Sequence, residues 1–153
     1  MNLRPAVEAD LAELARLHGL AFDPGWDAEQ IADIGSGPGA YGLIVEDPDP
    51  VGMILCRAVA GESEILTLAV DPAARRRGAG RALVEAAALT AEALGAESMF
   101  LEVAVDNAGA IGLYESAGFR VVGTRPAYYE RVGAARVDAT VMRRELNSRP
   151  TPA

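Results

Sequence analysis

The sequence has no lysine, one cysteine and one histidine, and these shortages exclude several kinds of chemistry. Because all 14 basic residues are arginines, neither Schiff-base catalysis nor a phosphate-binding loop with its lysine is possible. Cys56 alone cannot form an internal disulfide, and Cys56 with His18 cannot build a Cys/His zinc site. A Ser-His-Asp mechanism would depend on His18 alone. If the chain is an enzyme, we expect carboxylates or tyrosines to act as its acid and base.

Long apolar runs and an excess of positive charge are also missing. No stretch approaches the roughly 20 apolar residues of a transmembrane helix, and the N-terminus lacks the apolar segment of a signal peptide. The 22 acidic residues give a net charge of -8, which argues against nucleic-acid binding. We therefore expect a cytoplasmic protein without a membrane or nucleic-acid partner. Its 153 residues fit a single domain at 1–146 and a flexible tail at 147–153.

What is present is a regular alternation of strand and helix patterns. Hairpins in the first half and strand–helix–strand units in the second predict an α/β (α+β) fold, with a mixed sheet covered by helices. The sequence around Asp27 and Gln30 resembles a capping box. His18 and Cys56 are interpreted as packed residues of an apolar helix face and an apolar strand. Strands are expected at residues 2–6, 41–46, 51–60, 64–70, 98–103, 119–124 and 136–145, and helices at 8–20, 27–34, 80–94 and 108–117.

A glycine turn rich in arginine lies between the strand at 64–70 and the helix at 80–94. It contains Arg75, Arg76, Arg77, Gly78, Ala79, Gly80 and Arg81. Glycines allow a tight turn, and the helix that follows presents unpaired N–H groups, so such a loop can bind phosphate. Four arginines add positive charge and paired hydrogen-bond donors. The spacing alone leaves open a solvated basic turn without a ligand.

Three polar residues further along the chain are candidates for chemistry. Glu102 lies in an apolar strand, where alternation places it opposite Leu101 and Val103. It is interpreted either as a general base or as a carboxylate facing water. Asn107 is expected to cap the helix at 108–117. Tyr114 on that helix is interpreted as a proton donor or as a packed aromatic.

Two motifs together resemble the GNAT N-acetyltransferases. Residues 75–80 are similar to the Q/R-x-x-G-x-G/A signature of that family. The second motif, N-x-x-A-x-x-L-Y-x-x-x-G-F, is filled at every position, by Asn107, Ala110, Leu113, Tyr114, Gly118 and Phe119. Within the family, residues 66–72, Leu101–Val103 and residues 113–116 resemble the RimI type, the ribosomal-protein alanine N-acetyltransferases. The resemblance implies the GNAT fold, with a mostly antiparallel sheet of about seven strands and about four helices.

The resemblance also assigns roles to individual residues. It implies acetyl-CoA as acetyl donor, with its pyrophosphate on the loop from Arg75 to Arg81 and its pantetheine arm beside Leu68, Ala69 and Val70. Asn107 would also bind this cofactor. Glu102 would be the catalytic base and Tyr114 the catalytic acid, in a direct transfer that needs no metal.

The acceptor implied by this resemblance is a protein N-terminus, that of a basic ribosomal protein beginning with alanine. Tyr128 and Tyr129 are interpreted as lining the acceptor groove or as core residues at a strand end. Trp26 is interpreted as capping that groove or as anchoring the helix at 27–34. The segment at residues 22–26 departs from the F-P-W pattern of the RimI type by extra residues. Two alternatives remain at this stage, a GNAT enzyme that acts on a small amine or a lysine side chain, and a CoA-binding module without turnover.

Overall fold

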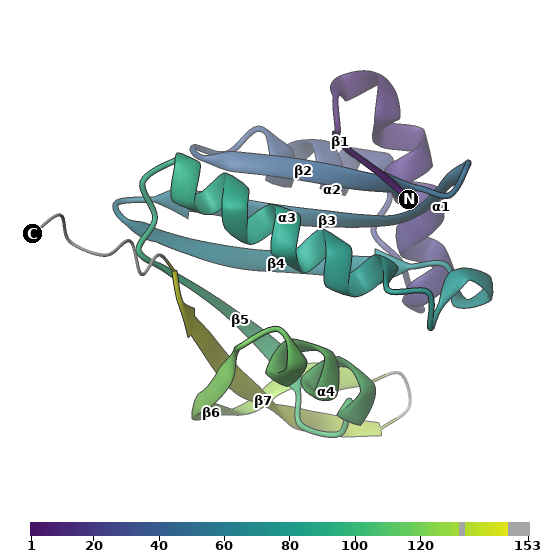
Figure 1. Ribbon diagram of the computed structural model, residues 1–153. Helices are drawn as coiled ribbons and strands as arrows, with labels where there is room; N and C mark the ends of the chain where they lie inside the picture. The colour runs from purple at the N-terminus through teal and green to yellow at the C-terminus, as the bar shows by residue number, and fades with distance from the viewer. Residues whose placement is uncertain (132–133, 147–153) are drawn as a thin grey trace, which may run out of the picture.

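The fold is a single twisted sheet with helices on both faces (Figure 1). It was obtained as a computed structural model, which describes the main chain of residues 1–131 and 134–146 and the side chains of 1–126 and 137–146. The strands within these residues are β1 (Asn2–Pro5), β2 (Ala40–Glu46), β3 (Pro50–Val59), β4 (Glu62–Val70), β5 (Ser98–Ala104), β6 (Arg120–Arg131) and β7 (Ala134–Glu145). The helices are α1 (Leu11–Ala21), α2 (Ala28–Gly35), α3 (Ala79–Ala93) and α4 (Ala108–Ser116), with short 3-10 turns at Glu8–Asp10 and Pro72–Ala74.

The seven strands lie in the order β1-β2-β3-β4-β5-β7-β6. Every neighbouring pair is antiparallel except β4 and β5, which are parallel. The expected mixed, mostly antiparallel sheet of seven strands is therefore confirmed. A parallel pair needs a crossover connection, and α3 provides it between β4 and β5.

Each face of the sheet carries its own apolar core. Helices α3 and α4 pack on one face, over a cluster that includes Leu83, Val84, Leu101 and Met142. Helices α1 and α2 pack on the other face, over a smaller cluster that includes Leu17 and Ile31. These two sides of the sheet are called the α3/α4 face and the α1/α2 face below. Because side chains along a strand alternate between the two faces, each strand residue can contribute to a site on one face only.

Local signals in the sequence explain several element boundaries. The capping box at α2 is confirmed, since the Asp27 carboxylate accepts the Gln30 backbone N–H at 2.8 Å and the Gln30 side chain accepts the Asp27 N–H at 2.9 Å. The expected helix at 8–20 instead begins with a 3-10 turn. There the Asp10 carboxylate accepts the Val7 N–H at 2.8 Å and pairs with Arg4 at 2.9 Å, which holds this turn against β1.

Strand β6 was predicted too short. The strand was expected to end at residue 124, but β6 continues through Pro126 to Arg131, with register shifts against β7 between Arg125 and Tyr129. Because β6 is the edge strand of the sheet, a proline there leaves no central ladder bond unmade. Strand β7 likewise starts at Ala134, within the expected loop.

Candidate active site

The central feature of the candidate site is a separation of β4 from β5. The two strands pair only where Glu62–Glu64 lies beside Ser98–Phe100. Strand β4 continues to Val70 and β5 to Ala104, and the two diverge (Figure 1). In the described part of the chain no other strand enters this gap. The edge of β4 beyond Glu64 is thus available to an extended ligand, in the manner of strand addition.

A β-bulge lies in β4 at the start of this gap. Leu55 of β3 pairs with Thr67 while Cys56 pairs with Ile65, so Leu66 is the extra residue. As a result Leu66 and Thr67 both face the α1/α2 side, where Leu66 packs with that core and Thr67 contacts His18. A bulge redirects backbone groups away from the regular ladder. It therefore breaks the alternation that the sequence analysis assumed for this strand.

The loop before α3 has the backbone conformation that the glycine signature predicts. Gly78 precedes the first turn of α3 with φ of 82°, a value that glycine adopts without strain. Arg76 has φ of 66°, in the left-handed region that non-glycine residues rarely adopt. A Cβ at Gly80 would lie 3.1 Å from Leu113 of α4, so this glycine serves helix packing. Helix α3 starts at Ala79, one residue earlier than expected.

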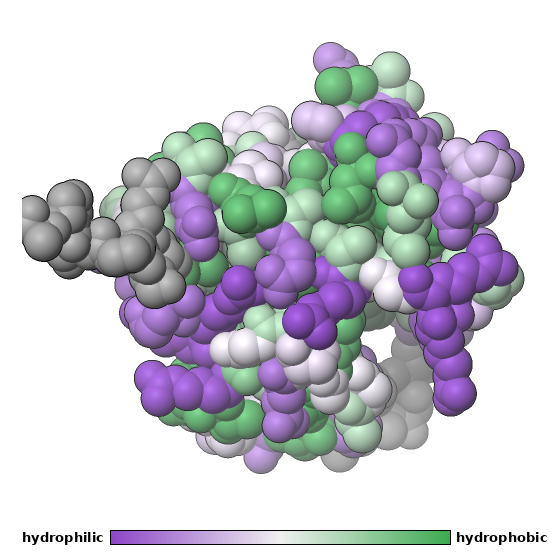
Figure 2. Space-filling view, viewed as in Figure 1, coloured by the Kyte–Doolittle hydropathy of each residue, from purple (hydrophilic) through white to green (hydrophobic). Residues whose placement is uncertain are grey.

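The arginines of this loop do not all point to one place. Arg75, Arg76 and Arg77 are exposed, and hydrophilic side chains project over this corner of the molecule at the right of Figure 2. Arg77 lies 3.7 Å from Asp47 in the β2–β3 turn. Arg81 turns along α3, with its Nε 3.5 Å from Glu85 and its Nη1 3.4 Å from Ser116. The cluster combines the positive end of α3 with several guanidinium groups, which is the chemistry that favours an anion.

The remaining residues expected to bind a cofactor border the same gap. Leu68, Ala69 and Val70 form the last part of β4, paired to β3 on one side only. Leu68 and Val70 pack toward the α3/α4 face and Ala69 toward the other. Asn107 caps α4, as predicted, with its Oδ1 accepting the Ala110 N–H at 3.2 Å.

On the α1/α2 face, a pocket of about 440 Å³ opens beside the gap. Among the residues that line it are three carboxylates and two guanidinium groups, so the pocket carries one net negative charge. These charged residues are Asp33, Glu64 and Glu102 with Arg57 and Arg125, and Trp26, Ile34, Leu66, Ile65 and Gly37 complete the wall. The excess of carboxylates suits an ammonium group, and we refer to this cavity as the acceptor pocket.

Glu102 lies in the acceptor pocket as its position in the strand predicts. Leu101 and Val103 are buried on the opposite face, and the Glu102 side chain keeps 24% of its surface exposed. Arg125 of β6 places its Nη1 3.3 Å from both carboxylate oxygens of Glu102. The strand alternation therefore identified the orientation of Glu102, whereas its pairing with Arg125 depends on strand β6 lying beyond β7.

Glu64 is a second carboxylate of this pocket that the sequence analysis did not single out. It lies 3.6 Å from Arg57 and is half-buried. Burial raises the pKa of the Glu64 carboxyl, the Arg57 charge opposes this shift, and the nearby Glu102 charge adds to it. The only sequence signal was the polar spacing of Glu62 and Glu64 in β4, which also fits a solvated strand end.

Tyr114 lies on the other side of the sheet from Glu102. It is 6% exposed, belongs to the core of the α3/α4 face, and packs edge-on against Phe119 at 5.6 Å between ring centroids. The two candidate catalytic residues thus flank the sheet from opposite faces. Trp26 is half-buried and lines the same pocket as Glu102. The side chains of Tyr128 and Tyr129 lie outside the described residues.

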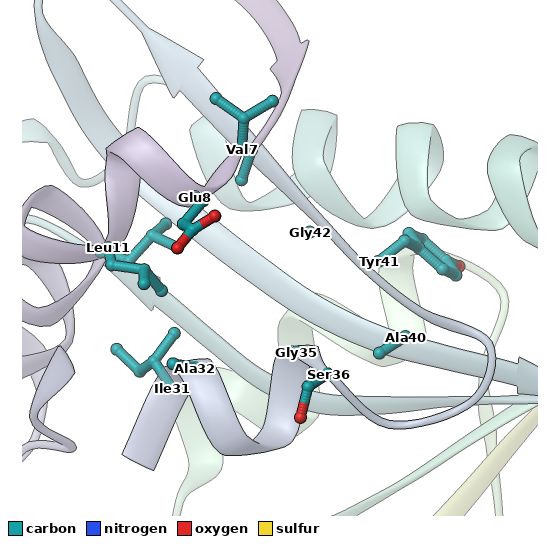
Figure 3. A pocket seen from close by; sticks show the side chains of 12 residues that line it. Val7, Glu8, Leu11, Ile31, Ala32, Gly35, Ser36, Ala40, Tyr41 and Gly42 are labelled. Carbon is teal, nitrogen blue, oxygen red and sulfur yellow. The ribbon is translucent and has the colours of Figure 1, made fainter. Parts of the chain in front are cut away.

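A separate hollow of about 460 Å³ lies between α1, α2 and β2 (Figure 3). Its lining is mostly apolar, with Glu8 as the one charged side chain among the lining residues. None of the predicted site residues borders it. The described residues contain no group of three His, Cys, Asp or Glu side chains able to hold a metal ion. No described helix combines the length and hydrophobicity that spanning a bilayer requires.

Comparison with known proteins gives a consistent result. The acetyltransferase (GNAT) family matches residues 10–119. The chain is 40% identical over 88 residues to a [Ribosomal protein bS18]-alanine N-acetyltransferase of Escherichia coli, covering 58% of this chain and 59% of that protein. It is 45% identical over 84 residues to an N-alpha-acetyltransferase RimI of Mycobacterium tuberculosis, covering 55% and 49%. The match thus spans about half the length of these curated relatives.

The fold comparison extends over nearly the whole chain. The crystal structure of the ribosomal-protein-S18-alanine N-acetyltransferase from Escherichia coli superposes with a TM-score of 0.85 and 26% identity, covering 99% of both chains. That of Ard1 from Thermoplasma volcanium has a TM-score of 0.82 and 26% identity, covering 96% of this chain and 98% of the other. The overall architecture is thus shared beyond the segments that align in sequence.

Proposed function

Because the chain belongs to the acetyltransferase (GNAT) family, we propose that it transfers an acetyl group from acetyl-CoA to the free amine of a protein N-terminus. The observation that supports this most is the gap between β4 and β5, which has a basic loop at one end and the acidic acceptor pocket on one face. Similarity to the [Ribosomal protein bS18]-alanine N-acetyltransferase of Escherichia coli supports the N-terminal alanine of a small-subunit ribosomal protein as the proposed acceptor. We also propose that the reaction takes place in the cytoplasm.

The donor side fits an anionic, extended ligand. The backbone edge of Leu68, Ala69 and Val70 would pair with the amides of the pantetheine arm, as a missing strand would. The N-terminal turn of α3 and the guanidinium groups of Arg75–Arg77 would hold the pyrophosphate, with Arg81 and Asn107 at the border of this site. When bound, acetyl-CoA supplies the acetyl group as a thioester.

The acceptor side fits a cationic amine. An N-terminal ammonium has a pKa near 8, so it enters the acceptor pocket charged and is attracted by the excess of carboxylates. Glu102 would receive the proton at its carboxylate, directly or through water, which leaves the amine neutral and nucleophilic. Arg125, which lies 3.3 Å from Glu102, would have to share this carboxylate with the incoming amine.

The second proton transfer, to the sulfur of the leaving group, would take place on the α3/α4 face. The Tyr114 hydroxyl would donate a proton to the departing sulfur, from within the α3/α4 core. A backbone N–H at the bulge of β4 would bind the carbonyl oxygen on which negative charge develops. Base and acid on opposite faces of the sheet suit a direct transfer, because the two protons move at different ends of the reacting group.

The test is acetyl transfer to synthetic peptides with free N-termini, compared with lysine side chains and polyamines. We expect peptides that begin with alanine to be acetylated, and Glu102→Gln and Tyr114→Phe to reduce kcat by about 10²- to 10⁴-fold while leaving acetyl-CoA binding unchanged. Glu115→Gln, at an exposed position beside Tyr114, is the matched control for the loss of one carboxylate and should keep full activity. Transfer to lysine side chains or polyamines alone would refute the N-terminal acceptor. Full activity of both site variants would refute the two proton roles.

A further inference from the structure

His18 connects the segment at residues 22–26 to strand β4. Its ring is 2% exposed and lies between the rings of Phe22 and Trp26, with centroid distances of 4.5 and 4.6 Å and interplanar angles of 21° and 11°. The Trp26 backbone N–H donates to Nδ1 at 2.8 Å, and Nε2 lies 3.0 Å from the Thr67 Oγ1. Both ring nitrogens and both ring faces are thus engaged.

These contacts determine the tautomer of the His18 imidazole. The Trp26 N–H is a donor and cannot accept, so Nδ1 must carry a lone pair and the proton must reside on Nε2. Nε2 then donates to the Thr67 hydroxyl. Burial lowers the pKa of His18 to about 4, in keeping with a neutral ring. A neutral, fully bonded ring has no spare nitrogen for proton transfer to a substrate.

The segment at residues 22–26 packs tightly against α1 and ends in the acceptor pocket. A Cβ at Gly25 would lie 2.5 Å from the Cα of Gly19, so the segment contacts the backbone of α1 directly. Trp26, the last residue of the segment, lines the acceptor pocket. Thr67, the other partner of His18, directly follows the bulged Leu66 of β4. His18 is therefore the side chain that links one wall of the pocket to the strand where the gap begins.

We propose that His18 is a positioning residue that holds Trp26 against β4 and thereby sets the affinity for the acceptor amine. This rests on the proposed function, because it assumes that the pocket beside Trp26 receives the acceptor. The donor side lies along Leu68, Ala69 and Val70 and the loop before α3, whereas the side-chain hydrogen bonds of His18 within the described residues go to Trp26 and to Thr67, which precedes that edge. The KM for the acceptor should therefore respond to His18, whereas kcat and the KM for acetyl-CoA should not.

The test compares His18→Leu, which removes both hydrogen bonds, with His18→Asn, whose amide oxygen can still accept the Trp26 N–H. We expect His18→Leu to raise the acceptor KM about tenfold, the effect of one unmade hydrogen bond in a buried site, with kcat and acetyl-CoA KM within about twofold. His18→Asn should recover most of that loss. Ala91→Gly is the control for stability alone, because it weakens α3 on the opposite face and should leave every KM unchanged.

Trp26 is the only tryptophan of the chain, so its fluorescence reports on this segment without any substrate. We expect His18→Leu to increase quenching of Trp26 by acrylamide and to shift its emission, with Ala91→Gly like the wild type. An unchanged emission would overturn the positioning role. A changed emission with an unchanged acceptor KM would overturn the link to acceptor affinity.

The two proposals can fail separately. If the wild-type protein acetylates no peptide N-terminus, the proposed function and the link to acceptor affinity both fail, while the fluorescence still decides whether His18 positions Trp26. If His18→Leu does not fold, Thr67→Val replaces it, since it removes the Nε2 partner and leaves the Trp26 bond in place. A wild-type acceptor KM and Trp26 emission in Thr67→Val would then overturn the anchoring to β4.

Discussion

Stability should fall as the pH drops below neutrality, and the cause is His18. Burial lowers the pKa of this histidine from 6.5 to about 4, so between these values the unfolded chain binds a proton that the folded chain does not. The folded state therefore loses stability as pH falls below about 6.5, and the loss stops growing below about 4. Protonation would also break the bond in which Nδ1 accepts the Trp26 N–H.

The magnitude follows from the difference between the two pKa values. One pKa unit corresponds to about 1.4 kcal/mol, so the full loss approaches about 3 kcal/mol. Integrating the proton linkage gives a loss of about 1 kcal/mol at pH 5.5 and about 2 kcal/mol at pH 5. Because His18 is the only histidine, no other side chain has an ordinary pKa near 6.5. Glu64 acts in the opposite direction, since burial raises its pKa and its folded form binds the proton first.

Urea denaturation followed by circular dichroism, at constant ionic strength between pH 7 and 5.5, measures this loss. The free energy of unfolding of the wild type should decrease by about 1 kcal/mol more than that of His18→Asn over the same range. The difference between the two proteins removes the contributions of Glu64 and of the other carboxylates. Equal slopes for the two proteins would show that His18 is not held neutral by the fold, and the reasoning would be wrong.

Two further predictions concern the basic loop and the start of α2. Acetyl-CoA should raise the melting temperature of the wild type, as measured by thermal unfolding with and without the ligand. The double variant Arg76→Glu, Arg77→Glu should lose this increase, because its loop would repel the pyrophosphate. An equal increase in the variant would contradict the assignment of this loop as the phosphate site. Asp27→Ala should reduce the free energy of unfolding by about 1 kcal/mol in urea denaturation, because it removes the acceptor for the Gln30 N–H; an unchanged value would mean that the cap contributes nothing.

Features that depend on neighbours in the sequence were predictable. The capping box at Asp27, the Asn107 cap of α4 and the orientation of Glu102 each follow from the spacing of a few residues, and all are confirmed. The seven strands and their mixed sheet were predictable for the same reason, since each strand has its own apolar pattern and its own turn signals. The roles of the catalytic and cofactor-binding residues remain predictions.

Features that depend on distant strands were not predictable. The bulge at Leu66 arises from the register between β3 and β4, and no local pattern marks it. The acceptor pocket brings Glu64, Glu102 and Arg125 together from β4, β5 and β6, which only the strand order of the sheet makes neighbours. His18 was expected to be packed, and it is, but its link to Trp26 depends on the chain folding back after α1.

The gap between β4 and β5 is closed at one end, where the two strands pair, and open at the other. The closed end is formed by the paired residues Glu62–Glu64 and Ser98–Phe100, beyond which the two strands diverge. Helices α3 and α4 approach each other closely, since a Cβ at position 80 would lie 3.1 Å from Leu113 and the Arg81 Nη1 lies 3.4 Å from the Ser116 Oγ. A larger side chain at position 80 would press on Leu113, so it would disturb the packing of α3 against α4 next to the proposed pyrophosphate site.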